Sequence, residues 1–407
     1  MKTLQRHPFL RRALHALGTA IVLLLLMQYL EYRGVLAGPE GKVLDVLQRP
    51  DGTSASGPVI TVEIDDAAYQ SCFGSASPLD PRGVFGMVNG IHAAGPSVIG
   101  VDILTNDEAR ADAYRTLAAE FPAAPARAVW ISGAADPTFK VASFPQWLIG
   151  AEDELVVKPT AVLGFQPDEL DRRRIRWGVP VFPRDPALGL RRFPREIYFE
   201  ATPPKPEEEA LSWARIIALR YCAGRSDCRL PGGAVHEVYL PYAGGPQRRI
   251  NALDIFRCPE PGSVETGGRL WSEFQEIARG RIVLLGGTWG RARDSYDTPI
   301  GRIPGVLVNA YAVLAEIHGT GIKERRLAVI FYDIAIGFGV AWIGWMTRHR
   351  RLRAMMTASG ALLAGALILN YWIFGRGYVL SFAGLIAGLF LHQIYEFWHM
   401  NPKAEEH

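Results

Sequence analysis

Four long apolar stretches constrain the fold of this chain more than any other feature of its sequence. They cover residues 13–30, 327–346, 354–374 and 378–398. A helix needs about 20 mainly apolar residues to cross the roughly 30 Å of hydrocarbon in a bilayer, and each stretch is close to that length. The sequence therefore predicts one transmembrane helix before a long outer segment at residues 34–326 and three after it.

Basic residues beside the predicted spans orient them. The two clusters are Lys2, Arg6, Arg11 and Arg12, and Arg348, Arg350, Arg351 and Arg353. Lys and Arg near the ends of a span are retained in the cytoplasm, so both clusters are expected inside. Lys323, Arg325 and Arg326 oppose this orientation locally but are outnumbered. The chain is thus expected in a bacterial inner membrane, with both ends cytoplasmic and the large segment on the periplasmic side.

The expected organisation has seven segments. They are a cytoplasmic N-terminus at 1–12, a first span at 13–30, an outer domain at 34–326, spans at 327–346, 354–374 and 378–398, and a cytoplasmic tail at 399–407. A secretory signal peptide is an alternative for the first span, because Val35, Leu36 and Ala37 form a small-residue pattern before Gly38. The apolar core is longer than the roughly 7 to 15 residues of a signal peptide, which favours an uncleaved anchor.

All four cysteines fall in the outer segment, where oxidation is expected. They are Cys72, Cys222, Cys228 and Cys258. Four cysteines allow three pairings. The short spacing of Cys222 and Cys228 favours a local bridge and leaves Cys72 for Cys258. Free thiols or a metal site are less favoured, because the sequence has no CxxC spacing or companion histidine.

The outer segment begins with a strand, helix and strand pattern. Residues 59–64 (VITVEI) are β-rich, Asp80 and Pro81 are suited to begin a helix, Gly95 is suited to end it, and 98–104 (VIGVDIL) follows at once. Short connectors of this kind make the two strands parallel and largely buried. The predicted fold class is α/β, with a largely parallel sheet in the outer domain and four transmembrane helices.

Further elements are predicted along the outer segment. Strands are expected at 127–132 and 160–165, a helix at 206–222, a buried strand at 282–285 and a helix at 304–318. The glycine-rich turn GGTWGR after the last strand could hold an anion on backbone amides, although a plain tight turn is the favoured interpretation. The basic, proline-rich region at 140–200 is either a solvated loop or a surface for a partner.

An aspartate lies inside the apolar run VIGVDIL. An ionised, unpaired carboxylate costs several kcal/mol when buried, so Asp102 needs a partner or a cleft. In parallel sheets, polar groups and ligands gather at the carboxyl ends of the strands, where Asp65, Asp66, Asp102 and Asp107 are all expected. Two interpretations stay open: a structural role, in which Asp102 caps a loop or pairs with an arginine such as Arg82, or contact with a ligand or ion. The candidate ligand-binding residues are Asp65, Asp66, Asp102, Thr288 and Asp297.

Several motifs together resemble a known sensory family. Their order is VEIDD, DPR before a helix, AAGPSVIGVDIL, Asp185-x3-Gly189-x-Arg191-Arg192, LPYAGG, GRIVLLGG, DTPIG and PGVLVNA. Over about residues 40–325 this order resembles the second type of CHASE domain, the cyclase and histidine-kinase associated sensory extracellular domain. The resemblance implies an extracytoplasmic sensor that signals through the membrane. Because only a short tail, MNPKAEEH, follows the last predicted span, the signal is expected to reach a separate effector.

Polar and small residues in the predicted spans are candidates for coupling. Asp333 and Asn370 are expected at similar depth, where a hydrogen bond between helices is favoured over a role in an ion pathway. Gly384 and Gly388 form a GxxxG pattern, which lets helices approach closely within one chain or between copies in a homo-oligomer.

Three classes of function follow from these features. The leading hypothesis is a non-catalytic sensor with no cofactor, whose partners are the lipid bilayer and the effector. The alternatives are an outward-facing enzyme with an aspartate-rich site and an oligomeric channel subunit. The net charge of +3 gives no electrostatic argument for binding nucleic acid, and the sequence leaves a metal undecided.

Overall fold

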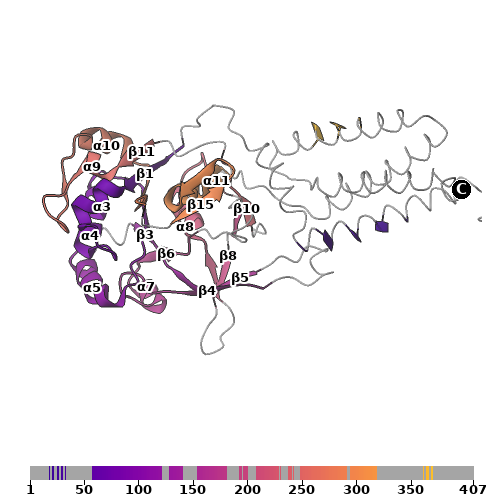
Figure 1. Ribbon diagram of the computed structural model, residues 1–407, viewed down its shortest axis with the longest axis horizontal. Coiled ribbons are helices and arrows are strands. Elements are labelled where there is room, and N and C mark those ends of the chain that lie inside the picture. Colours follow the sequence, from indigo (N-terminus) through magenta and orange to yellow (C-terminus); the bar gives the residue numbers. More distant parts are fainter. Residues whose placement is uncertain are drawn as a thin grey trace, which may run out of the picture. The chain divides into compact units, whose positions relative to one another are not determined.

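The computed structural model describes most of the outer segment. The described ranges are 57–121, 128–140, 154–180, 192–194, 196–199, 208–228, 230, 237–240, 242, 248–290 and 294–318, together with scattered positions between 18 and 33 and between 361 and 369. The chain divides into two compact units. The first comprises residues 1–47, 142–152 and 322–407, and the second comprises 48–141 and 153–321. Every helix and strand named below belongs to the second unit (Figure 1).

The four predicted spans lie largely outside the described residues. Within the part that is described, no helix is both long and apolar enough to cross a membrane. Asp333, Asn370, Gly384 and Gly388 also lie outside the described residues.

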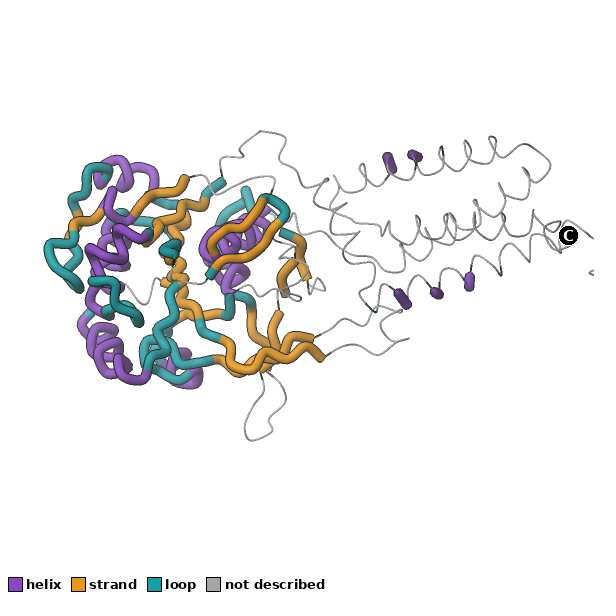
Figure 2. The backbone as a smooth tube through the Cα atoms, viewed as in Figure 1, coloured by secondary structure: helices purple, strands orange, loops and turns teal. Residues whose placement is uncertain are grey.

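The centre of the second unit is a sheet that lies between helices (Figure 2). It has six strands, and all neighbouring strands are parallel. Its order is β11-β1-β14-β2-β3-β6. These strands are β1 (Val59–Ile64), β2 (Val98–Asp102), β3 (Ala128–Ile131), β6 (Arg176–Gly178), β11 (Arg248–Asn251) and β14 (Ile282–Gly287). The prediction of an α/β fold with a largely parallel sheet is confirmed. The first two strands are parallel as predicted, but β14 lies between them.

Helices cover both faces of this sheet. One core contains side chains from α3 (Asp66–Phe73), α4 (Pro81–Ala93), α5 (Ala111–Glu120), α9 (Ala252–Ile255) and α10 (Trp271–Ala278). The other core contains side chains from α8 (Trp213–Cys222) and α11 (Gly305–His318) (Figure 1). Successive side chains of a strand point to opposite faces, so Val283 and Leu285 enter the first core while Ile282 and Leu284 enter the second. This double burial explains the nearly continuous apolar runs.

The start of α4 matches the prediction from sequence. The Asp80 carboxylate accepts a hydrogen bond from the Arg82 amide at 2.9 Å, and Pro81 is the first helical residue. An aspartate cap satisfies an amide that has no partner within the helix. The helix ends at Ala93, and Gly95 follows with a φ of +76°, a conformation that favours glycine.

Two predicted elements differ in the structure. Residues 160–165 form a tight turn closed by a Val162–Phe165 bridge, with positive φ at Leu163 and Gly164, instead of a strand. The helix expected at 206–222 begins only at Trp213, because residues 208–211 form strand β9 and the Ser212 hydroxyl accepts a hydrogen bond from the Arg215 amide. In the second place, pairing of β9 with β8 overrides the local helical pattern.

A second sheet of four strands and three two-stranded antiparallel sheets accompany the central sheet. The second sheet has the order β4-β5-β8-β9, with β4 (Ala134–Lys140), β5 (Glu154–Pro159), β8 (Glu196–Phe199) and β9 (Glu208–Leu211). The two-stranded sheets pair β7 (Arg192–Pro194) with β10 (Glu237–Tyr239), β12 (Phe256–Arg257) with β13 (Glu265–Thr266), and, as a hairpin, β15 (Ser295–Thr298) with β16 (Gly301–Pro304). Part of the basic, proline-rich region at 140–200 thus supplies strands of the second sheet.

Two disulfides stabilise the second unit, and they pair the cysteines as expected from the sequence. One joins Cys72 of α3 to Cys258, and the other joins Cys222 to Cys228. The larger bridge closes a loop with a sequence separation of 186 residues. Disulfides of this kind are typical of oxidising compartments.

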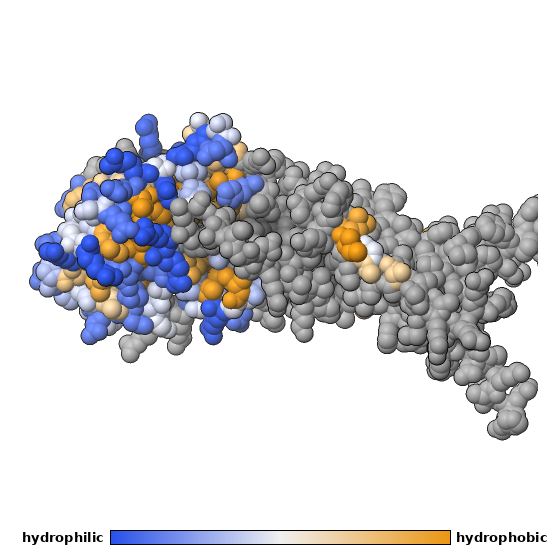
Figure 3. Space-filling view, turned by 90° about the horizontal axis from the view of Figure 1, so that it is seen from above, coloured by the Kyte–Doolittle hydropathy of each residue, from blue (hydrophilic) through white to orange (hydrophobic). Residues whose placement is uncertain are grey.

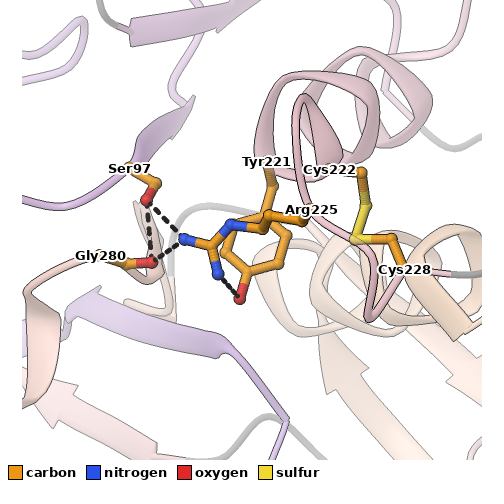
Figure 4. The surroundings of a disulfide bond; sticks show 6 residues. All are labelled: Ser97, Tyr221, Cys222, Arg225, Cys228 and Gly280. Atoms are coloured by element: carbon orange, nitrogen blue, oxygen red, sulfur yellow. Dashed lines mark hydrogen bonds between the residues drawn. A yellow bond between two sulfur atoms is a disulfide. The ribbon is translucent and has the colours of Figure 1, made fainter.

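The smaller disulfide lies beside an arginine that reaches the amino end of the central sheet (Figure 4). The Arg225 guanidinium donates hydrogen bonds to the Tyr221 hydroxyl at 2.9 Å, the Gly280 carbonyl at 2.8 Å and the Ser97 hydroxyl at 3.1 Å. Ser97 precedes β2 and Gly280 precedes β14, so the loop fastens the end of α8 to the starts of two central strands.

The surface of the second unit is mixed. In the view of Figure 3, hydrophilic residues predominate and apolar ones are scattered among them. Large apolar side chains with substantial exposure in the second unit are Leu104, Phe121, Leu219 and Ile300.

Gly100 sets how closely α8 approaches the sheet. A Cβ atom at this position would lie 2.7 Å from Cδ1 of Ile217 and 2.8 Å from Cζ2 of Trp213, and the Trp213 indole donates a hydrogen bond to the Val129 carbonyl at 2.9 Å. We expect Gly100→Ala to lower the free energy of unfolding by about 1–3 kcal/mol, the usual cost of overfilling a packed core. Chemical denaturation measures this change. Gly280→Ala, which adds a Cβ in open space at a positive φ, is the control for strain alone, and an equal loss in both variants would contradict the packing explanation.

We expect the double variant Cys72→Ser/Cys258→Ser to lose about 2–5 kcal/mol of stability, because the bridge restricts the unfolded chain. Urea melts of the oxidised wild type and the variant test this expectation. Cys222→Ser/Cys228→Ser is the matched control, since its closed loop is short and the loss should be smaller. The reverse ranking would contradict the expectation.

Candidate functional site

The candidate site lies at the carboxyl edge of the central sheet. Strand β1 leads into Asp65 and Asp66, β2 ends at Asp102, and β14 leads into Thr288. The register places Glu63 beside Gly286, and Gly286 beside Asp102. Four of the five candidate residues therefore come together at this edge, as the rule for parallel sheets predicts.

Asp65 and Asp66 bind groups of the fold itself. The Asp65 side chain caps α3 by accepting from the Ala68 amide at 2.8 Å, and its other oxygen accepts a hydrogen bond from the Asn251 side chain. The Asp66 carboxylate accepts from the Gly290 amide at 3.1 Å. Both carboxylates thus fix backbone segments at the edge of the sheet.

The loop after β14 is fastened to its neighbours. The Thr288 amide donates to the Ile64 carbonyl at 2.8 Å. The Trp289 ring stacks on Tyr69 of α3 with centroids 4.8 Å apart and an angle of 7° between the planes. Thr288 and its neighbours therefore form a tight, packed turn, the interpretation favoured from the sequence over an anion cradle.

Asp102 is held by Asn309 of α11. The Asn309 side-chain amide donates to Oδ2 of Asp102 at 3.0 Å. Arg82, the partner considered from the sequence, instead pairs with Asp80, with 3.1 Å between Nη2 and Oδ2. The Asp107 carboxylate caps the short helix η2 (Glu108–Arg110) by accepting a hydrogen bond from the Arg110 amide. The structural pairing expected for Asp102 therefore exists, but its partner is an amide on a distant helix.

A second carboxylate, Asp294, adjoins Asp102. Burial, and next the nearby Asp294 carboxylate, raise the pKa of Asp102 to about 7, while the hydrogen bond from Asn309 opposes the rise. Burial also raises the pKa of Asp294, which is hydrogen-bonded to Tyr296 of β15. Burial of the Tyr296 hydroxyl, and next the charge of Asp294, raise the pKa of Tyr296. The site is a pair of partly buried carboxyl groups with a tyrosine and an asparagine around them.

Asp297 does not belong to this cluster. It lies exposed on β15, opposite Arg302 in the register of the β15–β16 hairpin. The residues missed as candidates are Asp294, Tyr296 and Asn309. The motif PGVLVNA contains Asn309, and an asparagine within an otherwise apolar helix was the available signal.

Metal chemistry has no obvious ligand set in the described residues. Within these ranges, no three side chains of histidine, cysteine, aspartate or glutamate come together. The Asp102 and Asp294 pair is completed by an amide and a phenol instead.

Comparison with known families identifies the domain. Residues 18–346 match the CHASE2 domain. The chain therefore belongs to the CHASE2 family, whose domains are extracellular sensory domains and not catalytic ones. No curated protein and no solved structure matches the chain. The family resemblance predicted from sequence motifs is confirmed.

The raised pKa of Asp102 makes stability depend on pH. Because the folded pKa, about 7, exceeds the ordinary value of 3.8, the folded state holds a proton that the unfolded state has lost between about pH 4 and 7. Stability should fall as pH rises through this window, by about 4 kcal/mol at most, at about 1.4 kcal/mol per pH unit. We expect Asp102→Asn to reduce this slope in urea melts at several pH values, leaving the part that comes from buried Asp294, and Asp297→Asn to retain it in full. An unchanged slope in Asp102→Asn would refute the assignment.

Proposed function

We propose that this protein is a membrane-anchored extracytoplasmic sensor that passes a conformational signal through its transmembrane helices to a separate effector. The observation that carries the proposal is the CHASE2 match. It begins within the first predicted span and ends at residue 346, the last residue of the second predicted span. The matched region thus joins the sensory unit to both of its expected anchors.

The position of the sensory unit in the chain supports a signalling route. Its first central strand, β1, begins at Val59, soon after the first predicted span, and its last helix, α11, ends at His318, shortly before the second. Helix α11 is buried from Gly305 to Ile317 and packs against α8 and the central sheet. A stimulus that moves α11 within this core would therefore act on the chain that enters the bilayer.

Other features agree with an extracytoplasmic location. Two disulfides are formed, as in proteins of oxidising compartments. The basic clusters beside the spans favour cytoplasmic ends.

We further propose that the GxxxG face at Gly384 and Gly388 lets copies of the chain associate. The signal would then be a change in how the transmembrane helices of these copies pack.

The aspartate-rich edge supports sensing more than catalysis. Asp65, Asp66 and Asp102 each bind a group of the fold, through the Ala68 amide, the Gly290 amide and the Asn309 side chain. Such carboxylates position strands and loops. The fourth acidic group, Asp294, adjoins the start of α11, where a change of charge would bear on the helix that leads to the membrane.

Topology is tested by reporter fusions. An alkaline phosphatase joined at residue 185 should be active and a fluorescent protein at the same site dark, because the sensor is proposed to lie outside the membrane. The same reporters joined at residue 350 should behave in the reverse way. A phosphatase that is inactive at 185 and active at 350 would refute the proposed orientation.

The sensory role is tested by removing the outer unit. Deletion of residues 40–322 with all four predicted spans retained should abolish the stimulus dependence of the downstream response. Membrane levels of the deleted and full-length chains are compared by immunoblot, so that loss of protein is not mistaken for loss of sensing. A response that stays fully stimulus-dependent without the outer unit would rule out the proposed function.

A further inference from the structure

We propose that this sensor responds to acidity, through a proton shared by Asp102 and Asp294 that latches the β15–β16 hairpin onto the start of α11. The inference rests on the proposed sensory function and names its stimulus. In the protonated state one carboxyl group donates to the other and the hairpin stays in place. When the proton leaves, two carboxylates face each other and the hairpin is displaced.

Asp102 is the fixed half of the latch. It ends β2, a central strand with β14 on one side and β3 on the other. Its backbone is in register with Gly286 of β14, where an added Cβ would lie 3.1 Å from Cβ of Asp102 and 2.6 Å from Cβ of Val306. The hydrogen bond from Asn309 holds the side chain against α11. Asp102 therefore has little freedom to move away from a neighbouring charge.

Asp294 is the half of the latch that leads into the hairpin. Its carboxyl group occupies the space that a side chain at Gly305 would fill, and its carbonyl accepts a hydrogen bond from the Gly305 amide at 2.9 Å. It immediately precedes the β15–β16 hairpin, which among the described strands is a two-stranded sheet of its own. Movement of Asp294 can therefore carry the hairpin with it and leave the six-stranded sheet intact.

The groups around the pair favour sharing a proton. The groups that act on Asp102 are Asp294 and Asn309, and Asp294 in turn is bound by Tyr296. Arg249, which faces Tyr311 on α11, is held by Glu63 through hydrogen bonds of 2.6 Å and 2.8 Å. Two adjacent carboxyl groups that lose water on folding resist full ionisation, because like charges repel strongly where solvent is excluded.

Two further arginines adjoin the pair in sequence. Arg291 and Arg293 precede Asp294 and lie outside the described residues. The full-length protein contains both arginines, so the protonation of the carboxyl pair is measured in that protein.

The latch is connected to the proposed signalling route. Strand β16 ends at Pro304 and the chain continues directly into Gly305, the first residue of α11. Release of the hairpin would thus free the first turn of the helix whose far end leads to the second predicted span. Acid closes the latch and neutral pH opens it.

Hydrogen–deuterium exchange tests the latch in the full-length protein, held in nanodiscs of phosphatidylcholine and phosphatidylglycerol. After correction for intrinsic exchange, protection of residues 295–304 should fall between pH 5 and 8, by up to about tenfold per pH unit, the limit for release of one proton. In Asp102→Asn one charge is absent, so the hairpin should stay protected throughout. Asp297→Asn, in the same hairpin but exposed, is the matched control and should behave as the wild type.

Infrared difference spectra of the wild type give a second measurement that does not depend on a variant folding. A protonated carboxyl band should titrate over the same range of pH as the exchange, and Asp102→Asn should lack it. The proposal is overturned if the wild-type band does not titrate, if hairpin protection does not change with pH, or if Asp102→Asn keeps the wild-type change.

The outcome is separable from that of the proposed function. If hairpin protection changes with pH but the response persists without residues 40–322, the sensory role is refuted and the proton site stands. If hairpin protection does not change with pH but the response requires residues 40–322, acidity is refuted as the stimulus and the sensory role stands.

Discussion

Burial of the central sheet on both faces is the constraint on which the rest of the structure depends. With α3, α4, α5, α9 and α10 on one side and α8 and α11 on the other, the four inner strands β1, β14, β2 and β3 are buried on both faces, and only the edge strands β11 and β6 carry exposed residues. A polar side chain within a strand must therefore be paired. Glu63, only 8% exposed, binds Arg249 of the next strand, and Asp102 binds Asn309. Asp65 and Asp66 lie just beyond the end of β1, where their carboxylates accept hydrogen bonds from the backbone amides of Ala68 and Gly290.

Much of the fold could be predicted where local chemistry determined it. The runs VITVEI and VIGVDIL are apolar because both faces are covered, and Asp80 with Pro81 begins a helix by rules that involve only neighbouring residues. Where a distant partner decides, local patterns were insufficient. Residues 208–211 read as helical, yet they pair with β8. The order of strands, with β14 between β1 and β2, is a property of the whole chain and leaves no local sequence signal.

The candidate site shows the same division. The rule for parallel sheets placed Asp65, Asp66, Asp102 and Thr288 at one edge, because each directly follows or ends a predicted strand. It could not select Asp294 over Asp297, since these residues are three positions apart in one acidic loop. The choice depends on which of them faces Gly305 and which faces solvent across from Arg302. Asn309 was not selected for a similar reason, because its contact with Asp102 depends on how α11 packs against the sheet.

The larger disulfide has a consequence for survival outside the cell. The chain between Cys72 and Cys258 contains β2, β3, β6 and β11, whereas β1 and β14, which lie between β11 and β2 in the sheet order, are outside that interval. Exposed loops are where proteases cut first. A single cut in any loop between these cysteines would leave the two fragments covalently joined and their strands interleaved, so that a nicked receptor domain stays in one piece.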